Sequence, residues 1–143
     1  MECIAYKNGY KYQLVNEYST HIPIKPEDDI HSDSGYIDLS QQGLLIIKKG
    51  YAWDGPSGPT FDTLNFMRGS LVHDALYQIM REGKLDNITY RKPADKLLKN
   101  MCKEDGMSSL RAWWVFKGLR MGGDPAADPD NKRPVIKAPG KCQ

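Results

Sequence analysis

The sequence has no long hydrophobic run and no excess of charge of one sign. Its 143 residues include 20 lysines and arginines against 18 aspartates and glutamates, which gives a formal net charge of +2. Non-specific binding to nucleic acid usually depends on a basic stripe and a pI above about 9. No apolar stretch approaches the roughly 20 residues that a membrane-spanning helix needs. We therefore expect neither a nucleic-acid-binding protein nor a transmembrane segment.

Cysteine is also scarce. The three cysteines, Cys3, Cys102 and Cys142, are an odd number, and none belongs to a pair with metal-ligand spacing, so neither a disulfide framework nor a zinc site is expected. Cys102 is expected to be a small buried side chain on a helix. Residues 1–7 lack the basic and apolar regions of a signal peptide. These features are typical of a protein made in the cytoplasm.

Short runs of β-branched and aromatic residues occupy the first half of the chain, which is typical of strands in a small antiparallel sheet. The runs are residues 11–15, 21–24, 36–39 and 44–47. Between the last two, the polar segment 40–43 ends in glycine, as hairpin loops often do.

The second half has the three- and four-residue apolar spacing of helices. It predicts helices over about 66–81, over about 89–104 with Thr89 as the N-cap, and from Ser108 to Gly122. The aromatic residues of the third helix are expected in the core. The predicted fold class is therefore α+β, with a small N-terminal antiparallel sheet followed by three helices.

A chain of this length usually forms one domain, and we assign it to residues 1–123. Residues 124–143 are polar and rich in proline. Such a segment buries too little apolar area to offset its ordering entropy. We therefore expect an extended or mobile C-terminal tail that becomes ordered only in contact with another chain.

A loop rich in glycine and proline, residues 50–62, precedes the first helix and is expected to bind a ligand, because glycine allows close approach of the backbone. On that helix, His73 and Tyr77 share a face, and Asp74 is turned about 100° away. If the first two helices pair antiparallel, Asp95 lies opposite His73 and fixes its tautomer. Further candidate site residues are Asp54, Ser57, Asp62 and Arg68. Alternatively, His73 is a structural residue, and Asp95 only favours the start of its helix.

Three motifs carry a resemblance to a known family. They are residues 51–60, residues 68–78, and Arg91 followed by Ala94 and Asp95. In these motifs the chain resembles the DUF1353 family of unknown function, which is frequent in bacteriophages and prophages. The resemblance extends from Tyr36 to about Gly122 and implies a phage-encoded protein.

The loop and helix also resemble the secreted phospholipase A2 superfamily, in which a calcium loop precedes a helix that bears His-Asp. This resemblance implies that His73 is the general base, that Asp95 orients it, and that Tyr77 supports the pair. It implies that Asp74 binds calcium, a cation that prefers oxygen ligands. The implied backbone ligands to calcium are Trp53, Gly55 and Gly58.

The first functional hypothesis is therefore a bacteriophage hydrolase that acts on lipid or cell-envelope esters, with calcium as a candidate cofactor. The second is a virion structural or tail-associated protein without catalysis, and the third is a protein that binds a host factor. The expected partners are other virion proteins or a component of the host envelope. The protein would be made in the host bacterial cytoplasm and would remain there or enter the virion.

Overall fold

The structure, a computed structural model, describes residues 4–6, 12–53, 64–122, 127–129 and 136–138. Antiparallel strands come first and three helices follow, so the fold class is α+β, as predicted. The strands are β1 (Ile4–Tyr6), β2 (Tyr12–Gln13), β3 (Tyr18–His21), β4 (Ile30–His31), β5 (Ile37–Leu39), β6 (Leu44–Ile47), β7 (Ala52–Trp53) and β8 (Ile136–Ala138). The helices are α1 (Leu64–Arg81), α2 (Asn87–Glu104) and α3 (Ser109–Gly122).

The main sheet has four strands in the order β3-β6-β5-β4, all antiparallel. The predicted hairpin loop joins β5 to β6, and the Ser40 amide donates a hydrogen bond to the Leu44 carbonyl across it. Gly43 has a φ of 86° in this loop. A Cβ atom there would lie 2.4 Å from the Ile22 carbonyl oxygen, so the loop requires glycine at this position both for its backbone angle and for space.

Two of the strand predictions were wrong in their extent. Of the run 21–24, only His21 lies in a strand, although Ile22 and Ile24 are buried. Pro23 separates these two isoleucines and has no N–H to continue the ladder. In the run 11–15, the strand β2 is confined to two residues and pairs with β7 in a separate two-stranded sheet.

Helices α1 and α2 pack side by side and run antiparallel, since Arg68 near the start of α1 bonds to Asp105 just after the end of α2. Gly83 and Gly106 follow the two helices with positive φ angles, as expected of helix C-termini. The predicted N-cap of α2 was wrong. Asp86, rather than Thr89, caps the helix, and its carboxylate accepts from the amides of residues 88 and 89.

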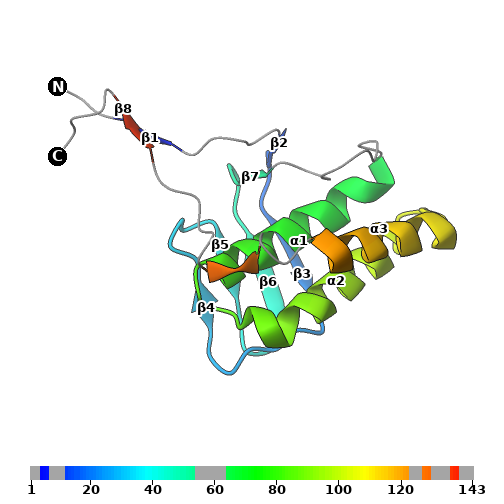
Figure 1. Ribbon diagram of the computed structural model, residues 1–143. Coiled ribbons are helices and arrows are strands. Elements are labelled where there is room, and N and C mark those ends of the chain that lie inside the picture. Colours follow the sequence, from blue (N-terminus) through cyan, green and yellow to red (C-terminus); the bar gives the residue numbers. More distant parts are fainter. Residues whose placement is uncertain (1–3, 7–11, 54–63, 123–126, 130–135, 139–143) are drawn as a thin grey trace.

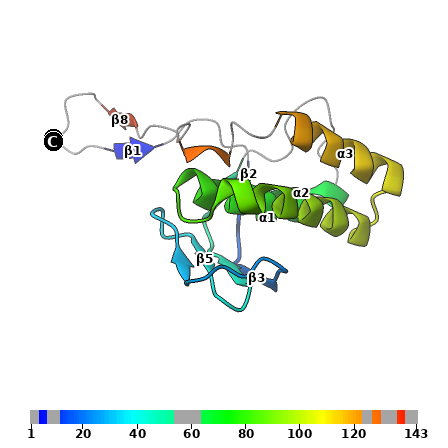
Figure 2. The same cartoon turned by 60° about the horizontal axis from the view of Figure 1, so that its bottom comes forward.

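The main core lies between the sheet and α1. Figure 2 shows the four-stranded sheet on one side of α1 and α2, and α3 on the other. The largest fully buried apolar side chains of this core are Ile37, Leu39, Leu45, Ile47, Val72, Leu76, Ile79 and Met80. A smaller cluster of Phe66, Leu98, Cys102, Met107 and Ala112 joins the three helices, and Cys102 is buried as predicted.

The prediction that the aromatic residues of the third helix lie in the core was wrong for its two tryptophans. Ala112 is the one buried residue of α3, and Trp113 and Trp114 are exposed. The sequence of α3 is apolar on both faces, so its periodicity does not indicate which face packs inward.

The two ends of the chain approach each other in strands β1 and β8, which pair antiparallel to one side of the sheet and helices (Figure 1). Strand β8 belongs to the segment assigned to the tail, as does Ala127, which is fully buried against the main core. None of the described helices is long and apolar enough to cross a membrane.

Candidate active site

A buried cluster of polar side chains joins α1 to α2. The Nε2 atom of His73 lies 2.8 Å from Oδ1 of Asp95, and the Tyr77 hydroxyl donates to the same oxygen at 2.5 Å. The rings of His73 and Tyr77 lie with their centroids 4.0 Å apart, as expected of residues one helical turn apart. All three side chains are buried, and Asp95 is fully buried. The antiparallel pairing of the helices therefore brings Asp95 to His73, as the sequence predicted.

A fourth member of the cluster comes from α3 and was missed by the sequence analysis. Nη1 of Arg120 donates a hydrogen bond of 3.0 Å to Oδ2 of Asp95. The backbone around Arg120 is held in turn, because Arg91 donates to the carbonyl oxygens of Leu119 and Arg120 at 2.9 and 3.1 Å. Arg120 lies in the last turn of α3, where a basic residue commonly favours the helix end, so its sequence position gave no sign of this contact.

These contacts set the charges of the cluster. Burial alone would raise the pKa of Asp95, but the hydrogen bonds from His73, Tyr77 and Arg120 outweigh it and hold that pKa below its usual value. Burial and the Asp95 carboxylate both raise the pKa of Tyr77, which therefore stays a neutral hydrogen-bond donor. Asp95 is accordingly a buried carboxylate that is ionised at neutral pH.

The two ring nitrogens of His73 lie in different surroundings. Nε2 faces Asp95, whereas Nδ1 lies 3.8 Å from Oδ1 of Asp74. The Asp74 side chain is partly exposed. Burial disfavours the imidazolium, but the two carboxylates outweigh it and raise the pKa of His73. One nitrogen is therefore held in the interior, and the other lies beside a carboxylate that reaches the surface.

The remaining predicted site residues are distributed differently. Trp53 is buried in β7, and its Nε1 atom donates to the Ser70 hydroxyl at 3.2 Å. Arg68 forms ion pairs with Glu104 and Asp105 rather than with the histidine cluster. The other candidates lie outside the described residues: Asp54, Gly55, Ser57, Gly58 and Asp62.

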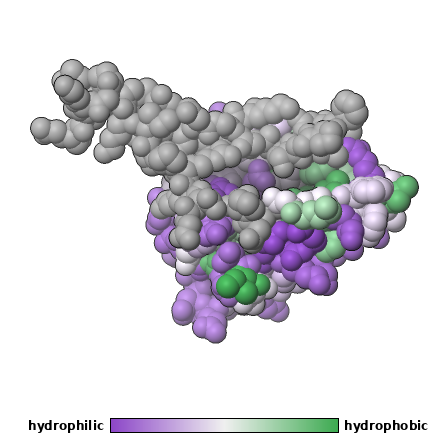
Figure 3. Space-filling model, viewed as in Figure 1, coloured by the Kyte–Doolittle hydropathy of each residue, from purple (hydrophilic) through white to green (hydrophobic). Residues whose placement is uncertain are grey.

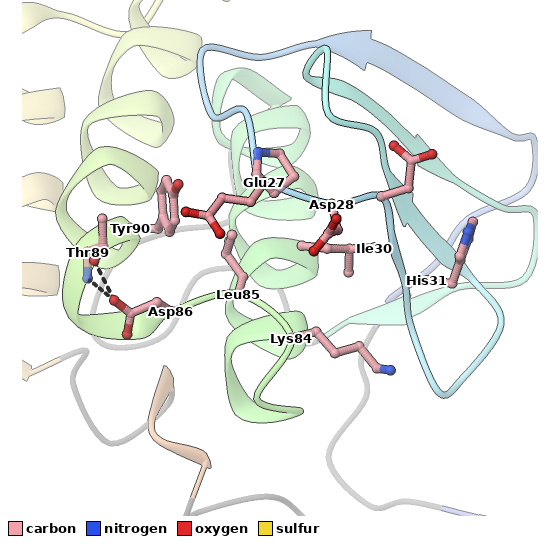
Figure 4. A pocket seen from close by; sticks show the side chains of 11 residues that line it. Glu27, Asp28, Ile30, His31, Lys84, Leu85, Asp86, Thr89 and Tyr90 are labelled. Carbon is pink, nitrogen blue, oxygen red and sulfur yellow. Dashed lines mark hydrogen bonds between the residues drawn. The ribbon is translucent and has the colours of Figure 1, made fainter.

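A pocket of about 550 Å³ lies where the segment 26–31 faces the turn between α1 and α2. Four carboxylates line it, from Glu27, Asp28, Asp29 and Asp86. In Figure 4 the last of these bonds to Thr89 at the start of α2 and thus serves as a helix cap. No residue of the histidine cluster lines this pocket. Within the described part of the chain, no three histidine, cysteine or carboxylate side chains are grouped closely enough to hold a metal ion.

The comparisons with known proteins identify a family and nothing more specific. No curated protein and no solved structure matches the chain. The sequence pattern of the family described as "Protein of unknown function (DUF1353)" matches residues 29–119. This range covers more than half of the chain and includes His73, Tyr77 and Asp95. The chain therefore belongs to the DUF1353 family.

Proposed function

We propose that this protein is a bacteriophage-encoded hydrolase that cleaves ester bonds of lipids or of another cell-envelope component. The observation that carries the proposal is the asymmetry of His73, whose Nε2 is held by Asp95 while Nδ1 lies on the side of the partly exposed Asp74. A general base requires an imidazole that is oriented through one nitrogen while the other can take a proton. In His73, which is itself buried, that second nitrogen is Nδ1.

In the proposed reaction, Nδ1 of His73 removes a proton from a water molecule as the water oxygen attacks the ester carbonyl carbon. The C–O bond to the leaving group then breaks, and the imidazolium returns the proton to the departing alkoxide. The products are a carboxylic acid and an alcohol, and the histidine regains its starting state. Asp95 accepts a hydrogen bond from Nε2–H throughout the reaction, which fixes the tautomer of His73 and stabilises its imidazolium.

Tyr77 and Arg120 are positioning residues in this proposal. They donate to Oδ1 and Oδ2 of Asp95, so that this carboxylate stays ionised and aligned with the imidazole ring. Because the cluster draws on all three helices, the ring is held by the packing of α1, α2 and α3 rather than by a mobile loop.

Asp74 is suited to hold calcium, since its carboxylate is a hard oxygen donor, is partly exposed, and lies beside Nδ1. Because the described residues contain no group of three or more histidine, cysteine or carboxylate side chains that could hold a metal ion, the other ligands would be backbone carbonyls such as those of Trp53, Gly55 and Gly58, together with water. A bound calcium ion would stabilise negative charge that develops on the ester carbonyl oxygen.

The test is hydrolysis of short-chain nitrophenyl esters and of phospholipid vesicles by the purified full chain, with and without calcium. His73→Ala should lower turnover about 10²–10⁴-fold while circular dichroism still shows a folded protein. His21→Ala is the matched control, because His21 is an exposed histidine of the sheet. Wild-type activity that His73→Ala leaves unchanged, or no activity on any ester class, would overturn the proposal.

Calcium is tested separately through thermal stability. A ligand that binds only the folded state raises the melting temperature, and its stabilising free energy grows with the logarithm of its concentration over Kd. We expect calcium to raise the wild-type melting temperature and Asp74→Asn to abolish that rise. A melting temperature that neither calcium nor a chelator changes would remove calcium from the proposal and leave the role of His73 to be decided by the ester assay.

A virion structural or tail-associated role is the second candidate, and the saturation of Asp95 favours it. Three donors engage this carboxylate, and His73 is buried, as in a cluster that only stabilises the fold. In that case His73→Ala lowers stability by about 1–3 kcal/mol, because buried partners lose their hydrogen bonds. The wild type would then have no esterase activity for the substitution to remove.

A further inference from the structure

Helix α3 exposes an apolar stripe on the face opposite its packing side. The stripe consists of Leu110, Trp113, Trp114 and Met121, with relative exposures of 68%, 44%, 64% and 86%. Their spacing of three, one and seven residues places all four on one side of the helix. The buried side is formed instead by Ala112, with Val115 and Leu119 packed against the same small cluster. The helix is therefore amphipathic with part of its apolar surface turned outward.

A stripe of lysines lies beside it on α2. Lys92, Lys96, Lys99 and Lys103 follow one another at steps of four, three and four residues, so they share one helix face. Lys99 extends toward α3, because its Nζ atom lies 5.0 Å from the centre of the ring of Phe116, a residue of α3 beside the apolar stripe. Within α3 itself, the Nζ atom of Lys117 lies 5.5 Å from the centre of the Trp113 ring. In Figure 3 a strongly hydrophilic band over α2 runs alongside a strip of weakly polar to apolar colour over α3.

Charge is segregated between this region and the rest of the chain. Residues 87–122 contain eight lysines and arginines and three aspartates and glutamates, so their formal charge is +5. The whole chain carries +2, which leaves −3 for the remaining residues. Asp95 is buried, and Glu104 and Asp105 are paired with Arg68. Helix α3 contains no acidic residue at all. Among the residues that the structure describes, none of the four lysines of the stripe on α2 forms an ion pair with a carboxylate.

We propose that α3 and the lysine stripe of α2 form a docking surface for a membrane that contains anionic lipids. Tryptophan is favoured at the boundary between headgroups and acyl chains, because its ring is apolar and its N–H is polar. The flexible aliphatic side chains of Leu110 and Met121 would enter the acyl region beside it. Lysines on the flank then meet the phosphate groups, as in helices that lie in the membrane plane.

The composition of the stripe favours lipid over the two other occupants that such a surface suggests. Proteins that bind single-stranded nucleic acid combine a basic groove with aromatic side chains on which the bases stack, whereas half of this stripe is aliphatic. The rings of Trp113 and Trp114 meet edge to face, with an interplanar angle of 73°, and do not form parallel platforms. A second copy of the chain would bring two lysine stripes together, and like charges would oppose that contact.

The docking proposal does not depend on catalysis, so its test uses vesicles without carboxylic ester bonds. Ether-linked phosphatidylglycerol mixed with ether-linked phosphatidylcholine gives an anionic surface that a hydrolase does not alter. Binding is measured by co-sedimentation and by the blue shift of tryptophan fluorescence. We expect binding to anionic vesicles that weakens as salt is added, and weak binding to vesicles of phosphatidylcholine alone.

Two variants test the two parts of the surface. Met121→Ser combined with Trp114→Ser should reduce partitioning at least about tenfold, since it removes two exposed apolar anchors. Lys96→Glu should reduce it by more than about fivefold, because it removes one cation near the membrane surface and adds one anion. The matched controls are Val15→Ser, an exposed apolar residue outside this surface, and Lys25→Glu, an exposed lysine far from it in sequence. Both controls should bind as the wild type does.

Three results would overturn the proposal. The first is equal binding to neutral and anionic vesicles, or no binding to either. The second is a dimer in analytical ultracentrifugation that Trp114→Ser dissociates, which would assign the surface to a second copy of the chain. The third is tighter binding to a single-stranded oligonucleotide than to the vesicles. Vesicle binding without ester hydrolysis would leave the docking surface intact and reject only the proposed enzymatic function.

Discussion

Asp95 is the residue whose removal should damage the protein most, because three donors from two helices converge on one buried carboxylate. Asp95→Ala leaves the Tyr77 hydroxyl and the His73 ring without their acceptor in the interior. Each buried group that loses its partner costs about 1–3 kcal/mol, and breaking a buried ion pair costs about 3–5 kcal/mol. We therefore expect Asp95→Ala to lower the free energy of unfolding by about 3–5 kcal/mol.

Asp95→Asn provides a graded comparison. The asparagine amide retains one oxygen that still accepts a hydrogen bond from Tyr77 or His73. Its NH2 group cannot accept from Arg120, and the negative charge that attracted the guanidinium is lost. A hydrogen bond to a charged group contributes about 1.5–3 kcal/mol, and we expect a loss in that range. The Arg120 side chain is about one-third exposed, so water replaces part of its contact. Arg120→Met should therefore cost only about 1 kcal/mol.

Urea titration followed by circular dichroism measures these differences. With an m-value of about 1–3 kcal/mol/M, the expected loss for Asp95→Ala moves the midpoint by more than about 1 M at constant m. If Asp95→Ala does not fold, Asp95→Asn still reports on the cluster. A loss below about 1 kcal/mol for Asp95→Ala would refute the view that this cluster holds the helices together.

The same residue predicts a dependence on acid. The folded-state pKa of Asp95 is lowered, so its stabilising contribution is fully present above the unfolded value of about 3.9 and is lost as the pH falls through the folded value. The wild type should therefore lose stability below about pH 4 more steeply than Asp95→Asn does. Parallel curves of unfolding free energy against pH for the two proteins would show that Asp95 is not the group responsible.

Three further predictions concern packing. Gly43→Ala should lose more stability than Gly35→Ala. Both glycines have positive φ, but only a Cβ atom at position 43 would meet a backbone atom, the Ile22 carbonyl oxygen at 2.4 Å. Equal midpoints in urea would contradict this steric argument. Gly69→Val should cost about 1–3 kcal/mol by thermal melting, since its Cβ would lie 2.7 Å from a leucine methyl of α2; a melting temperature at or above the wild-type value would show that the helices have room to separate. Burial raises the pKa of the Cys102 thiol to about 11. With the other two cysteines replaced by serine, Cys102 should therefore react with a thiol reagent at pH 8 about 100-fold more slowly in the native protein than in urea. Equal rates would show that α2 opens readily.

The helices could be predicted because their apolar spacing and terminal glycines give the same answer. Gly83 and Gly106 follow helices whose ends at Arg81 and Glu104 agree with the prediction. The start of α2 was placed too late, because Ile88 is exposed and does not belong to the apolar stripe that indicates a helix. Local sequence therefore determines where a helix ends more clearly than where it begins.

The pairing of His73 with Asp95 could be predicted because it depends on a short connection between neighbouring helices. Arg120 could not be predicted, because its contact depends on how α3 is rotated about its own axis. That rotation turns Ala112 inward with Val115 and Leu119 beside it, while both tryptophans lie on the outside. A sequence that is apolar on both faces gives hydrophobic periodicity no preferred direction.

The exposed stripe and the buried cluster meet in the last turn of α3, where Arg120 reaches Asp95 and the next residue, Met121, is exposed. Because α3 buries Ala112 fully and Val115 and Leu119 only in part, apolar burial fixes its position less firmly than that of α1. Its C-terminal turn is held instead by polar contacts, from Arg91 to two backbone carbonyls and from Arg120 to the carboxylate. Polar contacts of partly exposed side chains are weaker than core packing. A partner that orders the outer face of α3 would therefore also fix Arg120, and through it the carboxylate that orients His73.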